Sequence, residues 1–336
     1  MIRYLHFVSF CVRVSALCTT ALCVTANAGL VVPDDELINA WGVERIGAGY
    51  VHTSGNTGAG VKIGIIDSGI DYTHPDLSAN YAGGWDFVND DDDPRDDFGH
   101  GTLIAGIVGA VDDGQGIVGV APEASLYAYK ILDSSGGGTF DRVIAALDRA
   151  IADGMDVVNM SFGSFGDPGQ AVLDACERVA AAGILLVASA GNLGTFDGSG
   201  DNVVFPARYS SVIAVAATTD LDDRAFFSST GPDLELAAPG YNIYSTDLFG
   251  GYAFESGTSM AAAHVTGAAA LLIYAGFTDV RGRLLSTAYD LGPEGFDTLY
   301  GYGLVDVHAA MIPAPSALGL ALLGSLLVHR RFRSNS

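Results

Sequence analysis

The sequence predicts an α/β protein of three layers, in which helices cover both faces of a mainly parallel central sheet. Short apolar runs, each long enough for one buried strand, alternate with longer segments whose apolar residues recur every three or four positions. No segment repeats with a period of about 20 to 50 residues. No Pro- or Ser-rich linker divides residues 30–311, so we expect that stretch to form one domain.

The strands and helices of this domain are expected in alternation along the chain. Strands are predicted at residues 61–66, 125–132, 157–160, 184–189 and 212–217, and helices at residues 99–111, 139–153, 169–182 and 257–274. Strands that alternate with helices run parallel, so their carboxyl ends meet at one edge of the sheet. We expect the functional side chains in the loops at that edge.

The charge of the chain excludes one class of partner. The 39 acidic residues outnumber the 16 lysines and arginines, which gives a formal net charge of −23. A surface of this sign repels phosphate backbones, so we expect no nucleic-acid partner. The acidic runs 90–93 and 112–113 have two interpretations, since they could collect divalent cations or form a solvated acidic face.

Residues 1–28 have the features of a secretory signal peptide. Arg3 lies near the start, an apolar stretch occupies residues 14–24, and the segment ends on the small residues Ala26-Asn27-Ala28. We therefore expect an exported protein, secreted or held at the cell surface; a buried helix of the mature fold is the alternative. Three of the four cysteines lie in this segment, so the mature chain keeps only Cys176 and forms no internal disulfide.

Residues 312–336 form a second processing segment. Pro313-Ala314-Pro315 precedes a twelve-residue apolar run at 317–328 and a basic end. As a helix that run spans about 18 Å, short for a hydrocarbon core of roughly 30 Å. The segment resembles the PEP-CTERM sorting tails of Gram-negative bacteria, although those usually carry Pro-Glu-Pro. The resemblance implies an exosortase-type sorting enzyme as partner and transient contact with a membrane; a plain short membrane anchor is the alternative.

Three short segments carry candidate catalytic side chains. Asp67 ends an apolar strand just before the turn residue Gly69, where a carboxylate can orient an imidazole. His100 stands between two glycines at the start of a predicted helix, and glycines permit close approach. Ser259 lies in the first turn of the helix at 257–274, where free N–H groups and the helix dipole favour an oxyanion. Taken singly, Asp67 fits a turn, and His100 or Ser259 a helix cap.

The order Asp, His, Ser along the chain distinguishes among folds that use these residues together. Subtilisin-type proteases have this order, chymotrypsin-type proteases have His, Asp, Ser, and α/β-hydrolases have Ser, acid, His. Residues 30 to about 310 resemble the subtilisin-type (subtilase, peptidase S8) serine endopeptidases. The resemblance is carried by seven segments in order, at residues 66–69, 100–102, 158–163, 188–192, 205–207, 238–240 and 257–261. It implies a subtilisin-like fold.

The resemblance implies a role for each of four residues in peptide-bond hydrolysis. Ser259 is expected to attack the peptide carbonyl, and His100 to take its proton and later protonate the leaving amine. Asp67 is expected to hold the neutral tautomer of His100 and stabilise its charged form. Asn192 is expected to donate its side-chain amide to the oxyanion beside the main-chain N–H of Ser259; by itself it fits a turn residue.

The resemblance also implies where protein and peptide substrates bind. The substrate is expected as an added strand between two segments, using main-chain hydrogen bonds that give broad specificity. One segment is Ser161-Phe162-Gly163 and the other is Ser135-Gly136-Gly137. The first specificity pocket is expected between residues 161–163 and the segment Ala188-Ser189-Ala190-Gly191, with Val204 near its base. We expect a moderate apolar pocket, a monomer and no catalytic cofactor.

A structural Ca²⁺ ion is the one cofactor that the resemblance implies. Asp76 and Asp113 are expected to supply carboxylates, and Val111, Gln115 and Ile117 carbonyl oxygens. The ligand from the amino-terminal region stays open between Asp35 and Glu36. The alternative is a pair of solvated loop acids.

Three departures from the family pattern limit the resemblance. Ala263 replaces a common Pro early in the catalytic helix, and Leu103 replaces a common His that takes no part in catalysis. Only residues 29–38 separate the signal segment from the protease domain, so we expect no inhibitory folding propeptide. The domain is then expected to fold unaided, or with the help of a separate chaperone or of early calcium binding.

An inactive subtilase that acts as an extracellular binding or matrix module is the rival function. A nucleotide-binding enzyme is disfavoured because residues 64–69 do not form a G-x-G-x-x-G pattern, and a lipase is disfavoured because its catalytic residues follow another order.

Overall fold

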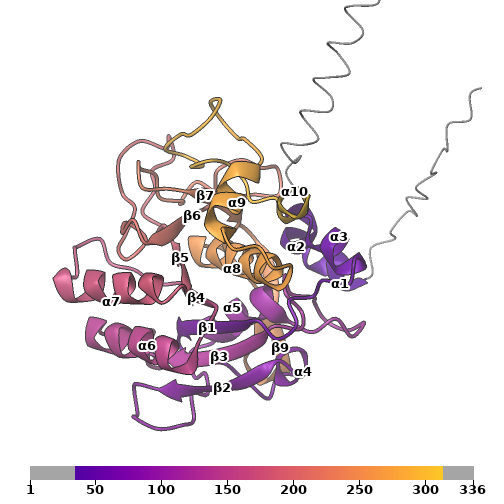
Figure 1. Ribbon diagram of the computed structural model, residues 1–336, viewed down its shortest axis with the longest axis vertical. Helices are drawn as coiled ribbons and strands as arrows, with labels where there is room; N and C mark the ends of the chain where they lie inside the picture. The colour runs from indigo at the N-terminus through magenta and orange to yellow at the C-terminus, as the bar shows by residue number, and fades with distance from the viewer. Residues whose placement is uncertain (1–34, 313–336) are drawn as a thin grey trace, which may run out of the picture. The chain divides into compact units, whose positions relative to one another are not determined.

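The structure, a computed structural model, describes residues 35–312, which belong to one compact unit. Its centre is a parallel sheet of seven strands, in the order β2-β3-β1-β4-β5-β6-β7 (Figure 1). The strands are β1 (Lys62–Asp67), β2 (Tyr81–Asp86), β3 (Ser125–Lys130), β4 (Val157–Met160), β5 (Leu185–Ser189), β6 (Val212–Thr218) and β7 (Leu236–Pro239). The predicted three-layer α/β fold is confirmed.

The central strands are hydrophobic on both faces because helices cover each face. Ile63 and Ile65 of β1 point into one core, and Ile66 points into the other. The first core includes α5 (His100–Gly109) and α8 (Thr258–Tyr274), and the second includes α6 (Phe140–Asp153) and α7 (Gln170–Ala181). Figure 1 shows α6 and α7 on the left of the sheet and α8 on its right. Burial on both faces is typical of parallel sheets.

Smaller elements surround this framework. Near the amino terminus lie α1 (Asp35–Asn39), α2 (Trp41–Arg45) and α3 (Ala48–Thr53), and α10 (Val307–Met311) packs against α3. The hairpin of β8 (Ile243–Asp247) and β9 (Gly251–Glu255), joined by the 3₁₀ turn Leu248–Gly250, packs on α5 through β8. The remaining helices are α4 (Pro75–Ser78) and α9 (Val280–Thr287).

The predicted strands and long helices are all present, with ends shifted by a few residues. Strands β2 and β7 and the hairpin were not predicted. Residues 81–86 include two adjacent glycines and residues 236–239 are only four with a Pro, so neither forms a clear apolar run. The signal segment 1–28 and nearly all of the tail 312–336 lie outside the described residues. Among residues 35–312, no helix combines the length and hydropathy needed to span a bilayer.

Cys176 lies on α7 with its side chain buried and is a free thiol. Burial raises the pKa of this thiol to about 12. The side chain is therefore a neutral part of the second core.

Candidate active site

Asp67 and His100 come from adjacent elements and bind each other. Asp67 is the last residue of β1 and His100 is the first of α5. Nδ1 of His100 lies 2.8 Å from Oδ1 and 2.9 Å from Oδ2 of Asp67, whose side chain is fully buried. The main-chain N–H of Ser68 also donates to Oδ1 of Asp67, at 2.7 Å. The buried carboxylate thus fixes the orientation of the imidazole and leaves Nε2 for another partner.

This contact requires glycine at position 101. A Cβ atom there would lie 2.2 Å from the carbonyl oxygen of Gly69 and 3.1 Å from Cβ of Asp67. The first distance leaves no room for a side chain, so α5 approaches β1 this closely only because residue 101 is glycine. The flanking glycine of His100 therefore sets the distance between helix and strand.

Burial is the largest single influence on the pKa of His100, and it acts to lower the pKa because it disfavours the charged ring. The charge and hydrogen bond of Asp67 act in the opposite direction, and Asp96 and Glu255 add to them. The carboxylates prevail, so the pKa of His100 lies above its ordinary value. The His100 side chain keeps 24% of its surface exposed and can meet a substrate.

Ser259 lies in the first turn of α8, as predicted, and its hydroxyl faces Ser161. Oγ of Ser259 donates to the carbonyl oxygen of Ser161 at 3.2 Å, and Oγ of Ser161 donates to the carbonyl oxygen of Ser259 at 3.0 Å. Helix α8 packs against α5, whose first residue is His100. Within the described residues, the side chains of Ser259 and His100 share no hydrogen bond. Catalytic hydrogen bonds often form only when substrate is bound, so the resting geometry leaves this contact to be made.

Asn192 follows β5 and lies beside the amino terminus of α8. Its Oδ1 accepts hydrogen bonds from N and Oγ1 of Thr258, at 2.9 and 3.0 Å. Oγ1 of Thr258 in turn accepts from the main-chain N–H of Gly191 at 3.0 Å. A Cβ atom on Gly257 would lie 3.3 Å from Nδ2 of Asn192, so the amide nitrogen is next to this helix terminus. Because Oδ1 is held, Nδ2 makes no hydrogen bond within residues 35–312 and is a free donor.

The segments predicted to bind substrate meet around Val204. A Cβ atom on Gly163 would lie 2.4 Å from Cγ2 of Val204, and one on Gly191 would lie 2.8 Å from its Cγ1. The Val204 side chain thus lies between the segments 161–163 and 188–191, and its role at the base of a pocket stays a prediction. Ala188 and Ala190 are fully buried, so they form walls and not open surface.

A cavity that was not predicted from the sequence lies between the predicted substrate segments 135–137 and 161–163. Its volume is about 270 Å³, and Leu132, Gly136, Phe140, Val143, Phe162 and Gly163 are among the residues that line it. Most of these side chains are apolar. The alternation of side chains along an extended peptide would direct one of them into this cavity.

Two further residues near His100 were missed by the sequence analysis. The ring of Phe98 covers Gly136, since a Cβ atom on Gly136 would lie 2.8 Å from Cζ of that ring. Glu255 is exposed at the end of β9 and acts on the pKa of His100. The only signal for either residue in the sequence is its position, two before His100 and two before Gly257.

The predicted calcium loop, residues 111–117, contacts both Asp76 and Glu36. The buried carboxylate of Asp76 accepts from the N–H of Ile117 at 3.3 Å and from the hydroxyl of Tyr252 at 2.9 Å. Oε1 of Glu36 accepts from the N–H of Gln115 at 2.7 Å and from that of Asp113 at 3.3 Å. Burial is the main cause that raises the pKa of Glu36 to about 7.

Oε2 of Glu36 is buried and has no hydrogen-bond partner in the described part of the chain. An orphaned carboxylate oxygen beside a loop of carbonyl groups fits a bound cation. No group of three or more His, Cys, Asp or Glu side chains in the described part of the chain is placed to hold a metal by itself. Carbonyl oxygens would therefore have to join the carboxylates as ligands.

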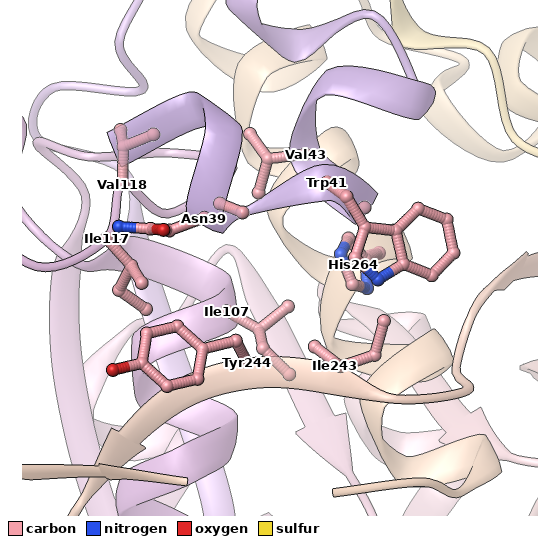
Figure 2. A pocket seen from close by; sticks show the side chains of 11 residues that line it. Asn39, Trp41, Val43, Ile107, Ile117, Val118, Ile243, Tyr244 and His264 are labelled. Carbon is pink, nitrogen blue, oxygen red and sulfur yellow. The ribbon is translucent and has the colours of Figure 1, made fainter. Parts of the chain in front are cut away.

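A small cavity of about 10 Å³ lies between α2, α5, β8 and α8, and Figure 2 shows His264 and Trp41 among its lining side chains. Nδ1 of His264 lies 2.8 Å from the carbonyl oxygen of Met260. On the other side of the ring, a Cβ atom on Gly42 would lie 2.3 Å from Nε2 of His264. Burial lowers the pKa of His264 to about 4, so the ring is neutral at pH 7. This His packs α2 against α8 and is separate from the candidate catalytic residues.

Comparison with known proteins identifies the family. The Subtilase family model matches residues 58–303. The chain is 45% identical over 275 residues to subtilisin DY of Bacillus licheniformis, covering 80% of this chain and 97% of that protein. It is 45% identical over 276 residues to subtilisin E of Bacillus subtilis, covering 80% of this chain and 70% of that protein.

A third relative is the minor extracellular protease Epr of Bacillus subtilis, 43% identical over 273 residues that make up 80% of this chain and 41% of that protein. The matched residues 58–303 include the seven-stranded sheet, helices α4 to α9 and all of the candidate catalytic residues. The chain therefore belongs to the subtilase family and is a subtilisin-type serine endopeptidase.

Proposed function

We propose that Asp67, His100 and Ser259 hydrolyse peptide bonds through an acyl-enzyme intermediate. The observation that carries this proposal is the pair of contacts, at 2.8 and 2.9 Å, between the buried Asp67 carboxylate and Nδ1 of His100. They direct Nε2 away from the carboxylate, as a general base for a serine requires. Ser259, at the amino terminus of the neighbouring helix α8, is the nucleophile.

The proposed reaction has two halves. Oγ of Ser259 adds to the peptide carbonyl carbon while its proton passes to Nε2 of His100. The C–N bond then breaks as His100 gives this proton to the leaving amine, which leaves an ester on Ser259. A water molecule, deprotonated by His100, adds to the ester carbonyl, and Oγ of Ser259 leaves with the proton that His100 returns. Asp67 stabilises the charged imidazole in both halves.

Asn192 is the proposed donor to the oxyanion that forms on the attacked carbonyl. Its Nδ2 is unpaired among residues 35–312, and it lies at the amino terminus of α8, where the helix dipole also favours negative charge. The main-chain N–H of Ser259 is the second donor. Losing one such donor typically lowers kcat about 10²- to 10³-fold.

The proposed substrate path lies between Ser135-Gly136-Gly137 and Ser161-Phe162-Gly163. An extended peptide there would use main-chain hydrogen bonds and place alternate side chains in two recesses. One is the space bounded by residues 188–191 and Val204, and the other is the 270 Å³ cavity lined by Leu132 and Phe162. Both have apolar walls, which supports broad specificity with a preference for apolar side chains.

The rival proposal, an inactive subtilase that serves as a binding module, makes a different prediction for casein hydrolysis. If Ser259 is the nucleophile, the unmodified chain should hydrolyse casein and the Ser259→Ala variant should not. A phosphonate inhibitor should label Ser259 in the unmodified chain and fail to label His100→Ala. Equal, negligible hydrolysis by two folded proteins would leave the binding module standing.

The calcium site is proposed from Asp76, Glu36 and the loop 111–117. Asp76, Asp113 and Glu36 would supply carboxylate oxygens, and Val111, Gln115 and Ile117 would supply carbonyl oxygens. The buried Oε2 of Glu36, which has no hydrogen-bond partner among the described residues, supports this set, and of Asp35 and Glu36 we propose Glu36 as the amino-terminal ligand. Bound Ca²⁺ would stabilise the fold and take no part in hydrolysis.

The ends of the chain are proposed to direct export. Residues 1–28 would be removed as a signal peptide, residues 29–311 would form the peptidase domain, and residues 312–336 would be a sorting tail handled by an exosortase-type enzyme of a Gram-negative bacterium. The motifs of the two ends support this proposal. Mass spectrometry of the exported protein should show that residues from about Pro313 onward are lost; an intact Ser336 would contradict it.

A further inference from the structure

Arg224 has a distinct set of partners: among the described residues, its guanidinium donates only to main-chain carbonyl groups. Nη1 donates to Ala225, Phe226 and Ser228 at 3.2, 3.5 and 2.6 Å, and Nη2 donates to Thr195 and Phe196 at 2.5 and 3.2 Å. Within the described residues it forms no ion pair, whereas Arg45 binds Asp222 and Arg281 binds Glu235. Five carbonyl oxygens thus converge on one positive charge.

Arg224 forms no ion pair among the described residues, although the charge of Asp197 acts to raise its pKa from a greater distance. The chain carries 39 acidic residues, yet Arg224 is placed among carbonyl dipoles. Burial lowers the pKa of its guanidinium, which shows that the group has lost part of its water. Carbonyl oxygens replace that water, much as they surround a bound cation in a protein loop. The planar, rigid guanidinium can serve several acceptors at once.

The carbonyl groups belong to two segments that flank Asn192. Thr195 and Phe196 follow Asn192 closely in an exposed loop, and the other three acceptors lie at residues 225–228. The segments also bond directly, from N of Gly194 to the Phe227 carbonyl at 2.8 Å and from N of Leu193 to Oγ of Ser229 at 3.2 Å. Arg224 therefore joins the chain just after Asn192 to the segment 225–228.

Apolar packing does little to hold this loop. The side chain of Phe196 is 90% exposed and that of Leu193 is 52% exposed. Beyond its own turn bonds, such as those from Thr195 to Asp197 and Ser199, the loop depends on its polar contacts with residues 224–230. Without Arg224, the carbonyl groups of Thr195 and Phe196 would lose their hydrogen bonds to residue 224, and the main-chain bond from N of Gly194 to the Phe227 carbonyl would remain.

We propose that Arg224 is a positioning residue for oxyanion stabilisation, acting through Asn192. By binding the carbonyl groups of Thr195 and Phe196, it fixes the backbone after Asn192, while Thr258 fixes the side-chain oxygen of Asn192. With both ends held, Nδ2 points at the place where the oxyanion forms. A donor must be held within about 0.5 Å of its productive position, so a loosened loop lowers kcat.

The inference rests on the proposed role of Asn192, and kinetics on the full chain test it. With a peptide p-nitroanilide substrate, Arg224→Ala should lower kcat about 10- to 100-fold and change KM less than about twofold. Guanidinium chloride at low millimolar concentration should restore part of kcat by filling the vacated space. A fall in kcat that guanidinium does not reverse, or a loss confined to KM, would overturn the inference.

The matched control is Arg283→Ala, because Nε of Arg283 also donates to a main-chain carbonyl, that of Ala310 at 2.7 Å. This variant should leave kcat and KM unchanged. If Arg224→Ala does not fold, Arg224→Lys replaces it in the test. Lysine keeps the charge but not the planar set of donors, so this variant should also lower kcat, by a smaller factor. Unchanged kcat in folded Arg224→Lys would then contradict the inference.

A double-mutant cycle separates this inference from the proposed function. Asn192→Ala should lower kcat about 10²- to 10³-fold, and on that background Arg224→Ala should have no further effect on kcat. Additive effects would mean that Arg224 does not act through Asn192, while the oxyanion role of Asn192 survives. If Asn192→Ala leaves kcat unchanged, the proposed role of Asn192 fails in its own right.

Discussion

Both carboxylate oxygens of Asp67 lie within hydrogen-bond distance of Nδ1 of His100, at 2.8 and 2.9 Å, and the carboxylate is fully buried. A buried charge needs a partner, and His100 is the one ionisable group hydrogen-bonded to it among the described residues. The pair is therefore both an electrostatic unit and the orienting half of the proposed triad.

Asp67→Asn should lower kcat about 10⁴-fold with little change in folding. Asparagine is similar in shape but can favour the tautomer of His100 whose Nε2 carries the proton and cannot accept one from Ser259. Steady-state kinetics measure the loss, and Asp148→Asn, which removes only a surface ion pair with Arg178, is the control. A loss for Asp67→Asn no greater than that of the control would contradict the assigned role.

Glu255→Gln should move the acid limb of the pH profile of kcat/KM to lower pH. His100 must be neutral to act as a base, and the negative charge of Glu255 helps to raise its pKa. Removing that charge lowers the pKa of His100, so more of the base is neutral in mildly acidic solution.

The shift should shrink at high salt, because Glu255 is exposed and its field is screened. Asp174→Asn, on the surface of α7, offers a charge-matched comparison and should leave the profile in place. An acid limb that Glu255→Gln leaves unmoved or shifts to higher pH would show that the two groups are not coupled.

Chelation of calcium should lower the unfolding temperature. A ligand that binds only the folded state stabilises it by about 2.7 kcal/mol at a concentration 100 times its Kd. Glu36→Gln should reduce the effect of EGTA on Tm, whereas Glu44→Gln, an exposed change in the same region, should not. Differential scanning calorimetry with and without EGTA checks this, and a Tm that EGTA does not move in the unmodified chain refutes the calcium site.

Gly101→Ala should separate helix α5 from strand β1. The new methyl group would lie 2.2 Å from the carbonyl oxygen of Gly69, and overpacking of this kind typically costs about 1–3 kcal/mol of stability. Moving α5 also carries His100 away from Asp67, so activity should fall by more than the loss of folded protein explains. Gly166→Ala is the control, since the nearest atom to a Cβ there is 4.0 Å away. Equal activities per folded molecule would refute the argument.

The sequence alone was enough for the fold class, and it supplied the residues that we propose as the reacting groups. Apolar runs that alternate with amphipathic segments predict a parallel sheet covered by helices, because strands buried on both faces must be apolar throughout. Asp67, His100 and Ser259 were proposed from their order along the chain and from the family resemblance, since each by itself also fits a turn or a helix cap. Strands β2 and β7 were missed because short or Gly-containing strands leave no clear pattern.

The tertiary structure decided which atoms meet. Only the folded chain shows that the hydroxyl of Ser259 rests on the Ser161 carbonyl, that Glu36 reaches the loop at 111–117, and that Arg224 gathers carbonyl groups around the loop after Asn192. Hydrogen bonds of this kind join residues far apart in the chain, and no local pattern encodes their partners. Their geometry follows from how the helices and the sheet pack, since packing sets the distances over which a proton or a charge can act.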